Sequence, residues 1–379
     1  MAAAPNPVSL GNPRSRGDRI LALLAPYLSF ADHLTLRIVC RGWRRSCRLL
    51  GRAPPPFPWL MLPPPSPTRG PPAPGAAQRR VFYDIPRGRT YAYAVPALHR
   101  YVASRGGWLV LAAVHPPRRL VLMNPITGAR GVIAWPFGEK VIDGFHAVLT
   151  SSPADPACFL AVATDRLVAY CRPGRGGGWV TLRAPGFRYD TAGSDVLAVG
   201  ATVYLVDERR KLWRADLAAA EPKVERRDTA FALPQGERRL HYLVKSLGHV
   251  HLVVSDEHHK RMALFRLDWH ARMWVPTPAD GLGDRVLLLG RGCSAAVPSW
   301  AASGRAPGTV LIARQAWGFL HVGSDARGGE QPWFWTESRL NAGLDDQMAL
   351  KKTVPHRPGV FTAGDSFWFF PGIDSTECA

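Results

Sequence analysis

Lysine, cysteine and long apolar runs are scarce in this chain of 379 residues. Only 7 of the 48 basic residues are lysine, and the other 41 are arginine. The longest mostly apolar run, from Val196 to Val206, has eleven residues, whereas a membrane-spanning helix needs about 20. We therefore do not expect an integral membrane protein.

The six cysteines are few for this length, and no two of them form a C-x-x-C pair. This scarcity favours a reducing compartment, the nucleus or the cytoplasm, and argues against a disulfide framework or a cysteine zinc site. The start, Met1 to Asn12, has no apolar block of the kind found in secretory signals. Ala2 to Arg16 is basic and free of acidic residues, so an organelle transit peptide is the alternative.

Acidic residues are also outnumbered: 48 basic residues against 29 acidic ones give a net charge of +19 and a pI near 10.4. Such a charge first suggests a nucleic-acid binder. However, the preference for arginine accompanies abundant Ala, Gly and Pro, a bias that GC-rich codon usage produces without selection for phosphate contacts. The first 100 residues hold 15 arginines against three aspartates. We therefore expect that nucleic acid is not the partner.

The first part of the chain is expected to be disordered over residues 1–14 and helical over 15–50. Pro26 should end the first helix, because proline lacks the amide donor and clashes with the preceding turn. Ser29 and Asp32 have the spacing of a capping box that starts a second helix, and Arg41 opens a third, basic turn. The apolar positions of the first helix recur every three or four residues: Ile20, Leu21, Leu24 and Leu28. A helical segment this small usually needs a partner or a neighbouring domain.

Residues 51–80 contain eleven of the 35 prolines. Most of this stretch should be an extended, semi-rigid linker. Four large apolar residues, Trp59 to Leu62, interrupt it. We predict that this segment, 58–63, is where the chain docks onto the following domain.

From residue 81 to 375 the pattern changes to short strands separated by tight turns. Five apolar stretches begin at Trp108, Phe159, Val196, Tyr242 and Val286, at intervals of 51, 37, 46 and 44 residues. The middle three are each followed by a turn, a second strand and a third strand with an aromatic residue. Such a period predicts a mainly β fold, a β-propeller of six or seven blades. A pair of β-sandwiches is the alternative, but sandwiches lack a fixed period.

The helical part, Asp18–Asp32 and Leu36–Arg44, resembles an F-box. The match is carried by Asp32, Val39, Cys40, Trp43 and Arg44, whereas Gly17-Asp18 replaces the usual Leu-Pro opening. The later part is similar to a KIB-type β-propeller, the plant domain of unknown function that commonly follows F-boxes in grasses. Six segments carry this resemblance in order: Pro58–Pro63, Gly107–Leu111, Leu122–Gly128, Leu267–Val275, Gly283–Gly290 and Phe367–Pro371.

Together the two resemblances imply a substrate receptor of a Skp–cullin–F-box ubiquitin ligase that performs no chemistry itself. The helical part would bind the Skp adaptor, and through it a cullin, while the propeller would bind an unidentified target protein. The adaptor-binding residues under this interpretation are Leu21, Leu24, Leu28, Asp32, Leu36, Val39 and Trp43. Two alternatives stay open: the helices pack on the propeller as an appendage, or a basic propeller binds nucleic acid or an acidic ligand independently of any ligase.

Other motifs give weaker signals. Six of the twelve histidines lie between His241 and His270, and His249 and His251 share one strand face, but we expect solvated turn histidines instead of a metal site. Gly174–Gly178 lacks the ending of a phosphate loop, and no catalytic motif or cofactor site is predicted. Arginine pairs recur at 118–119, 209–210, 226–227 and 238–239, and we expect solvated loop tips there. A second interpretation is a basic rim that attracts an acidic or phosphorylated target segment.

Overall fold

The fold was analysed on a computed structural model of the full chain. The residues that the structure describes are 16–24, 28, 32, 35–36, 39–49, 57–62, 76–97, 99–113, 119–135, 137, 144–174, 178–189, 193–207, 210–227, 239–256, 262–302, 305–313, 335–339, 351–353, 367–369 and 371. The predicted disordered segment 1–14 and the predicted cap at Ser29 lie outside these ranges. The chain divides into two compact units, Met1–Pro58 and Trp59–Ala379.

The first unit contains helices α1 (Arg16–Leu24) and α3 (Arg41–Leu49), which contact each other. Helix α1 ends two residues before Pro26, in agreement with the proline signal. Helix α3 begins at Arg41, where the sequence predicted a basic turn. Among the described helices, none is long and apolar enough to cross a membrane.

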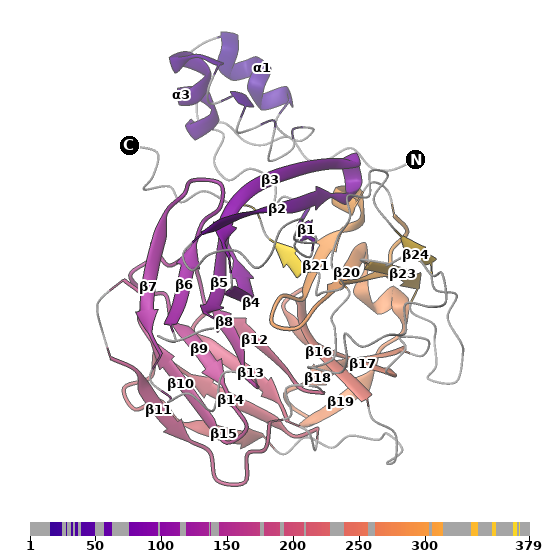
Figure 1. Ribbon diagram of the computed structural model, residues 1–379. Helices are drawn as coiled ribbons and strands as arrows, with labels where there is room; N and C mark the ends of the chain where they lie inside the picture. Colours follow the sequence, from indigo (N-terminus) through magenta and orange to yellow (C-terminus); the bar gives the residue numbers. More distant parts are fainter. Residues whose placement is uncertain are drawn as a thin grey trace, which may run out of the picture. The chain divides into compact units, whose positions relative to one another are not determined.

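The second unit is a six-bladed β-propeller, which confirms the predicted fold class and chooses six blades over seven (Figure 1). We number the blades in chain order and give their strands from the centre outward. Blade 1 consists of β25 (Phe367–Phe369), β1 (Trp59–Met61), β2 (Ala77–Asp84) and β3 (Arg89–Pro96). Blade 2 consists of β4 (His99–Arg105), β5 (Trp108–Ala113), β6 (Arg119–Met123) and β7 (Arg130–Ala134). Blade 3 consists of β8 (His146–Leu149), β9 (Leu160–Ala163), β10 (Leu167–Cys171) and β11 (Val180–Arg183). Blade 4 consists of β12 (Asp195–Val199), β13 (Thr202–Val206), β14 (Leu212–Asp216) and β15 (Val224–Arg227). Blade 5 consists of β16 (Arg239–Ser246), β17 (His249–Asp256), β18 (Met262–Asp268) and β19 (Met273–Pro276). Blade 6 consists of β21 (Ala295–Pro298), β20 (Arg285–Leu289), β22 (Thr309–Ala313), β23 (Trp335–Arg339) and β24 (Lys351–Thr353).

Burial along the strands follows their place in a blade. All six residues of β5 are buried, because the sheets of neighbouring blades cover both of its faces. The outer strand β7 instead alternates between exposed and half-buried residues, as the two-residue period of a strand predicts. Apolar clusters join blades 2 and 3, blades 3 and 4, blades 4 and 5, and blades 5 and 6. Packing between blades therefore supplies the core.

The ring closes through the strand at its C-terminal end. In blade 1, β25 pairs antiparallel with β1, and Leu60 lies opposite Trp368. The ring of Phe369 packs 4.9 Å from that of Phe82 in β2, centroid to centroid. The Trp368 indole Nε1 donates to the Leu289 carbonyl of blade 6 at 2.9 Å. The N-terminal strand of the propeller, β1, is thus held in place by the C-terminal strand β25.

The first strands of the propeller lie earlier in the chain than residue 81, where the sequence pattern predicted the propeller to begin. Residues 59–61 form a full strand of blade 1, and β2 begins at Ala77, within the range assigned to the linker. The proline content conceals both strands, since β1 has only three residues between prolines 58 and 63. Blade 6 also departs from a simple meander, because β20 pairs parallel with β22 after β21 and the turn η5 (Ser299–Ala302).

The turn between β20 and β21 fills the centre of the ring. The Gly292 N–H donates to the Asp195 carboxylate of β12 at 2.9 Å. A Cβ placed on Gly292 would lie 3.0 Å from the Ala147 carbonyl oxygen of β8 and 3.4 Å from the Val102 carbonyl oxygen of β4. One turn therefore touches the inner strands of blades 2, 3 and 4. We call this turn with Asp195 the central hub.

Asp195 is the charged member of the central hub and is fully buried. Its second carboxylate oxygen accepts the Leu243 N–H of β16 at 2.8 Å, so one side chain connects blades 4, 5 and 6. Burial raises the pKa of this carboxyl to about 7, although the N–H groups of Gly292 and Leu243 act in the opposite direction. The hub is therefore half neutralised near physiological pH.

We predict that Gly292→Ala destabilises the propeller far more than Gly200→Ala. Both glycines have a left-handed backbone, with φ of 64° and 58°, so each alanine loses about 1–2 kcal/mol for that conformation. Only at position 292 does the new methyl press on two backbone oxygens, which adds about 1–3 kcal/mol. Chemical denaturation of both variants measures the difference, and equal losses would contradict a filled centre.

We also predict a pH-dependent stability that Asp195→Asn removes. Because the folded pKa of Asp195 is raised above its ordinary value of 3.8, the folded state holds the proton more tightly than the unfolded state. The stability gained from this group is present at about pH 4 and is lost as the pH rises to about 7.

The Asp195→Asn variant keeps one acceptor oxygen but does not titrate at this position. His251, whose pKa burial lowers to about 4, titrates in the opposite sense in both proteins and cancels in their difference. The stability of the wild type relative to the variant should fall between pH 4 and 7. Parallel curves over that window would show that Asp195 is not a buried titrating group.

Candidate functional site

A groove of about 540 Å³ opens between blades 4 and 5. Its volume lies within the range of sites for small molecules or a few peptide residues. We call it the arginine groove, because guanidinium groups from three parts of the chain converge there. It is lined by Tyr204, Arg214, Arg226, Arg227, Leu267, Asp268, Trp269 and Arg272.

The wall on blade 4 is built by the hairpin of β14 and β15. Arg214 lies opposite Glu225, and Tyr204 of β13 lies opposite Arg214, so these residues share one face of the sheet. Arg227 projects from the same face two residues beyond Glu225, because strand side chains alternate. The register of three strands thus places two arginines beside a tyrosine ring.

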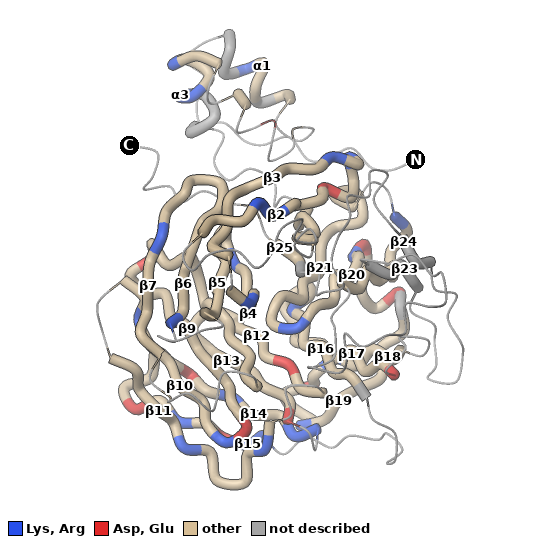
Figure 2. The backbone as a smooth tube through the Cα atoms, in the orientation of Figure 1, with Lys and Arg blue, Asp and Glu red and all other residues tan. Residues whose placement is uncertain are grey.

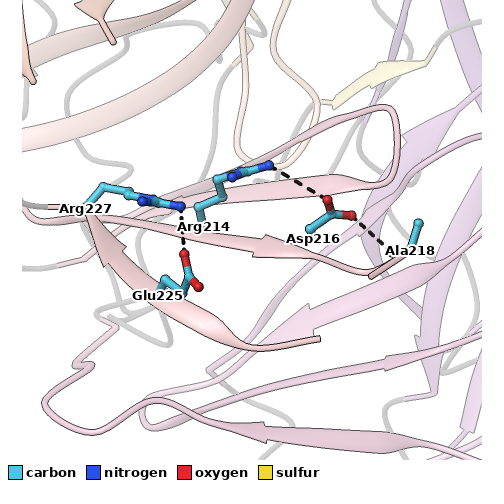
Figure 3. A network of polar contacts seen from close by, with 5 residues as sticks. All are labelled: Arg214, Asp216, Ala218, Glu225 and Arg227. Carbon is cyan, nitrogen blue, oxygen red and sulfur yellow. Dashed lines mark hydrogen bonds and ion pairs between the residues drawn. The ribbon is translucent and has the colours of Figure 1, made fainter. Parts of the chain in front are cut away.

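Carboxylates hold both of these arginines in place (Figure 3). The Arg227 Nη2 lies 2.7 Å from Glu225 Oε2, and the Arg214 Nη2 lies 3.8 Å from Asp216 Oδ2. Asp216 in turn accepts the Ala218 N–H at 3.2 Å, which fixes the carboxylate at the end of β14. These half-exposed pairs add little to stability, but they orient the guanidinium groups.

Arg214 keeps an unused donor. Its Nε is buried and has no hydrogen-bond partner among the described residues. The long contact to Asp216 employs only the outer nitrogen of the same side chain. The side chain is 33% exposed, so its outer nitrogens can still meet a second anionic group.

The wall on blade 5 is the turn between β18 and β19, residues 269–272. The Asp268 Oδ1 accepts the N–H groups of His270 and Ala271, each at 2.9 Å. These hydrogen bonds, that from Ala271 above all, lower the pKa of Asp268, which therefore stays ionised. The turn closes on Arg272, whose φ of 50° is uncommon for a residue with a side chain.

This rigid turn presents an aromatic ring and a cation to solvent. Trp269 is 45% exposed, and its ring packs against that of Tyr204 with their centroids 5.6 Å apart. Arg272 is also exposed and lines the same space. The groove thus combines cations with an apolar surface. Figure 2 shows basic and acidic positions interspersed around β14 and β15.

A second groove, about 470 Å³, is lined by residues that include Arg166, Arg188 and Tyr189. There the Tyr189 hydroxyl and the His146 Nδ1 are 2.7 Å apart and form a hydrogen bond. Two arginines face Asp165 in this groove, against four arginines in the first. The arginine groove is therefore the stronger candidate for a charged ligand.

The structure bears out the expected loop tips for some arginine pairs and not for others: Arg210 lies in the turn between β13 and β14, as expected. Arg226 and Arg227 lie in strand β15, because opposing residues of β14 pair with both. Arg119 lies in β6 and Arg239 in β16, while 118, 209 and 238 lie outside the described residues. The expectation of solvated loop tips is wrong for Arg226 and Arg227. The expectation failed there because two adjacent charged residues at the edge of a sheet have the same sequence pattern as two in a turn.

The histidine expectation also needs correction. His241 and His251 are buried, whereas His249 and His270 are exposed. His241 uses its Nδ1 on the Gly193 carbonyl oxygen at 2.6 Å. His249 and His251 do lie together, with ring centroids 6.3 Å apart. Within the described ranges, however, no three His, Cys, Asp or Glu side chains gather as metal ligands would.

The predicted adaptor-binding residues all lie in the first unit. Leu21 is buried, Leu24 and Val39 are exposed, and four others are half-buried: Leu28, Asp32, Leu36 and Trp43. Two further apolar residues of α1 are exposed, Ile20 at 47% and Leu23 at 72%. Leu23 was missed because it lies nearly opposite Leu21 around the helix, away from the apolar face that the spacing marks.

No curated protein sequence matches the chain. Three solved structures illustrate the structural likeness: AztD from Citrobacter koseri (13% identity, TM-score 0.32, 63% of this chain and 59% of that one), Hsv2 from Kluyvelomyces marxianus (12%, 0.30, 52% and 77%) and Aleuria aurantia lectin (9%, 0.34, 81% and 98%). This chain thus spans less than two thirds of the length of AztD.

The family comparison is more specific. The profile of the KIB1-4 β-propeller matches residues 82–330, which is more than half of the chain and extends from β2 past β22. A propeller of this type suggests a non-catalytic domain for protein–protein interaction. On this match, the chain belongs to the KIB1-4 β-propeller family.

Proposed function

We propose that this protein is the substrate-recognition subunit of a Skp–cullin–F-box ubiquitin ligase. In this proposal the first unit binds the Skp adaptor, and through it a cullin, while the propeller binds the target. The propeller itself suggests protein–protein interaction. The ligase role comes from the resemblance of residues 18–44 to an F-box and goes beyond that family match.

The observation that carries the proposal is the exposed apolar surface of helix α1. Ile20, Leu23 and Leu24 are each more than two-fifths exposed, although Leu21 of the same helix is buried. Three large apolar residues in one nine-residue helix are more than an isolated surface leucine. A groove on an adaptor would remove them from water, which stabilises a complex by about 1.5–3 kcal/mol for each fully buried side chain.

The division of the chain supports the same assignment. The boundary between the units falls at Pro58, so the helices form a compact unit distinct from the propeller. A ligase receptor needs such an arrangement, because the scaffold and the target must be bound at once. The alternative, a propeller that works without a ligase, assigns no purpose to the exposed leucines of α1.

We predict that Leu23→Asp with Leu24→Asp abolishes capture of the full-length protein by a Skp adaptor. Both side chains are exposed, so the charges should leave the helical unit folded while making burial in an adaptor groove unfavourable. Copurification of the two proteins measures the effect. A loss of at least about 100-fold in affinity is expected, since two buried leucines together contribute roughly 3–6 kcal/mol.

Val132→Asp is the matched control. Val132 is 63% exposed on β7 of the propeller, so the variant receives the same kind of substitution on the other unit. It should bind the adaptor like the wild type. If the helix variant is captured normally, the F-box assignment is wrong, whereas equal losses in both variants would indicate a general effect of added acid.

A further inference from the structure

We propose that the arginine groove binds a short anionic segment of a protein partner, with an apolar residue next to one or two negatively charged side chains. The charge is that of a carboxylate or a phosphate, which share the same guanidinium chemistry. The inference rests on the proposed function in one respect: it takes the segment to belong to the ligase target. The groove itself lies entirely within the propeller unit.

The first step is the convergence of charge. Arg214, Arg227 and Arg272 come from two blades, and each lines the same groove. Glu225 orients Arg227 by the short contact at 2.7 Å, and Asp216 lies 3.8 Å from Nη2 of Arg214, a side chain that stays 33% exposed. An incoming anion therefore meets donors that are already oriented, which reduces the entropy lost on binding.

The second step is the apolar surface beside the charges. Trp269 is 45% exposed and forms, with Tyr204, an aromatic edge to the groove. Asp268 holds the turn that carries Trp269 through two backbone hydrogen bonds, so the ring is presented by a stiff element. An apolar side chain next to the charged one would cover this ring. Exposed tryptophan and arginine are also the residue types that most often dominate binding energy at interfaces.

The third step concerns the class of ligand, and it favours a peptide over a nucleic acid. Asp216, Glu225 and Asp268 lie among the arginines on both walls. A nucleic-acid strand carries a charge on every phosphate and would meet these carboxylates, whereas a segment with one or two charged side chains avoids them. The volume of about 540 Å³ also suits a few residues rather than a continuous strand.

The test uses the full-length protein and three fluorescein-labelled peptides that share one short sequence with a central leucine. The residues beside the leucine are glutamate, phosphoserine or glutamine. Fluorescence polarisation should show binding of the two anionic peptides, weakened by salt, and at least about tenfold weaker binding of the glutamine peptide. The stronger of the two anionic peptides identifies carboxylate or phosphate as the preferred group.

Two double variants with the same net charge locate the binding. Arg227→Gln with Arg272→Gln changes the groove, and Arg119→Gln with Arg130→Gln changes exposed arginines of blade 2. The groove variant should bind the anionic peptides about tenfold or more weakly, and the blade 2 variant should stay within about twofold of the wild type. Equal losses would overturn the proposal, because attraction would then follow net charge alone.

Trp269→Ala provides a variant without a change of charge. It should weaken the anionic peptides several-fold while leaving the melting temperature near that of the wild type, because the ring is nearly half exposed. Unchanged binding would remove the aromatic part of the proposal. Failure of both anionic peptides to bind, or tighter groove-dependent binding of a single-stranded RNA probe, would overturn it entirely.

The result is independent of the ligase assignment. The groove variants should still be captured by the Skp adaptor, because the exposed leucines lie in the other unit. Peptide binding without adaptor capture would refute only the ligase role. Adaptor capture without peptide binding would refute only the groove.

Discussion

Closure of the ring is the constraint on which the other contacts of the propeller depend. A strand from residues 367–369 must reach back to residues 59–61 before blade 1 has an inner edge. Trp368 then ties that blade to blade 6 through the Leu289 carbonyl of β20, which completes the circle of blades. Closure gives blades 1 and 6 a second neighbour, so that every blade of the ring is covered on both faces.

Much of this fold could be predicted, because apolar strands separated by tight turns have a strong pattern. The uneven intervals have a structural cause: the stretches at Trp108 and Phe159 are the second strands of blades 2 and 3 along the chain, whereas those at Val196 and Tyr242 are first strands, so the interval of 37 residues spans less than one blade. The blade count stayed open for a related reason. In blade 6 the inner position is taken by β21 after a reversal of order, and blade 1 is assembled from both ends, so no repeating unit in the sequence corresponds to either blade.

The candidate site could not be predicted in the same way. Arg214 and Arg227 lie 13 residues apart on one hairpin of blade 4, but Arg272, 45 residues further along the chain, joins them only because blades 4 and 5 are neighbours. Sequence spacing reports contacts along one strand or helix, not contacts between sheets. Asp195 illustrates the same limit: an acid at the start of an apolar stretch reads as a solvated strand end, yet the structure buries it on amides from two other blades.

The filled centre also bears on where a partner can bind. In a ring of sheets, a ligand can approach along the axis or from the sides. Here Gly292 and its turn occupy the axis, and the Asp195 carboxylate is already saturated by backbone donors. A ligand there would have to displace a turn that holds three blades together. The edges of the blades are less constrained: Arg272 is exposed, and Trp269 is 45% exposed although its ring packs on the buried Tyr204 of blade 4. The proposed arginine groove lies on such an edge, where side chains can vary while the ring remains closed.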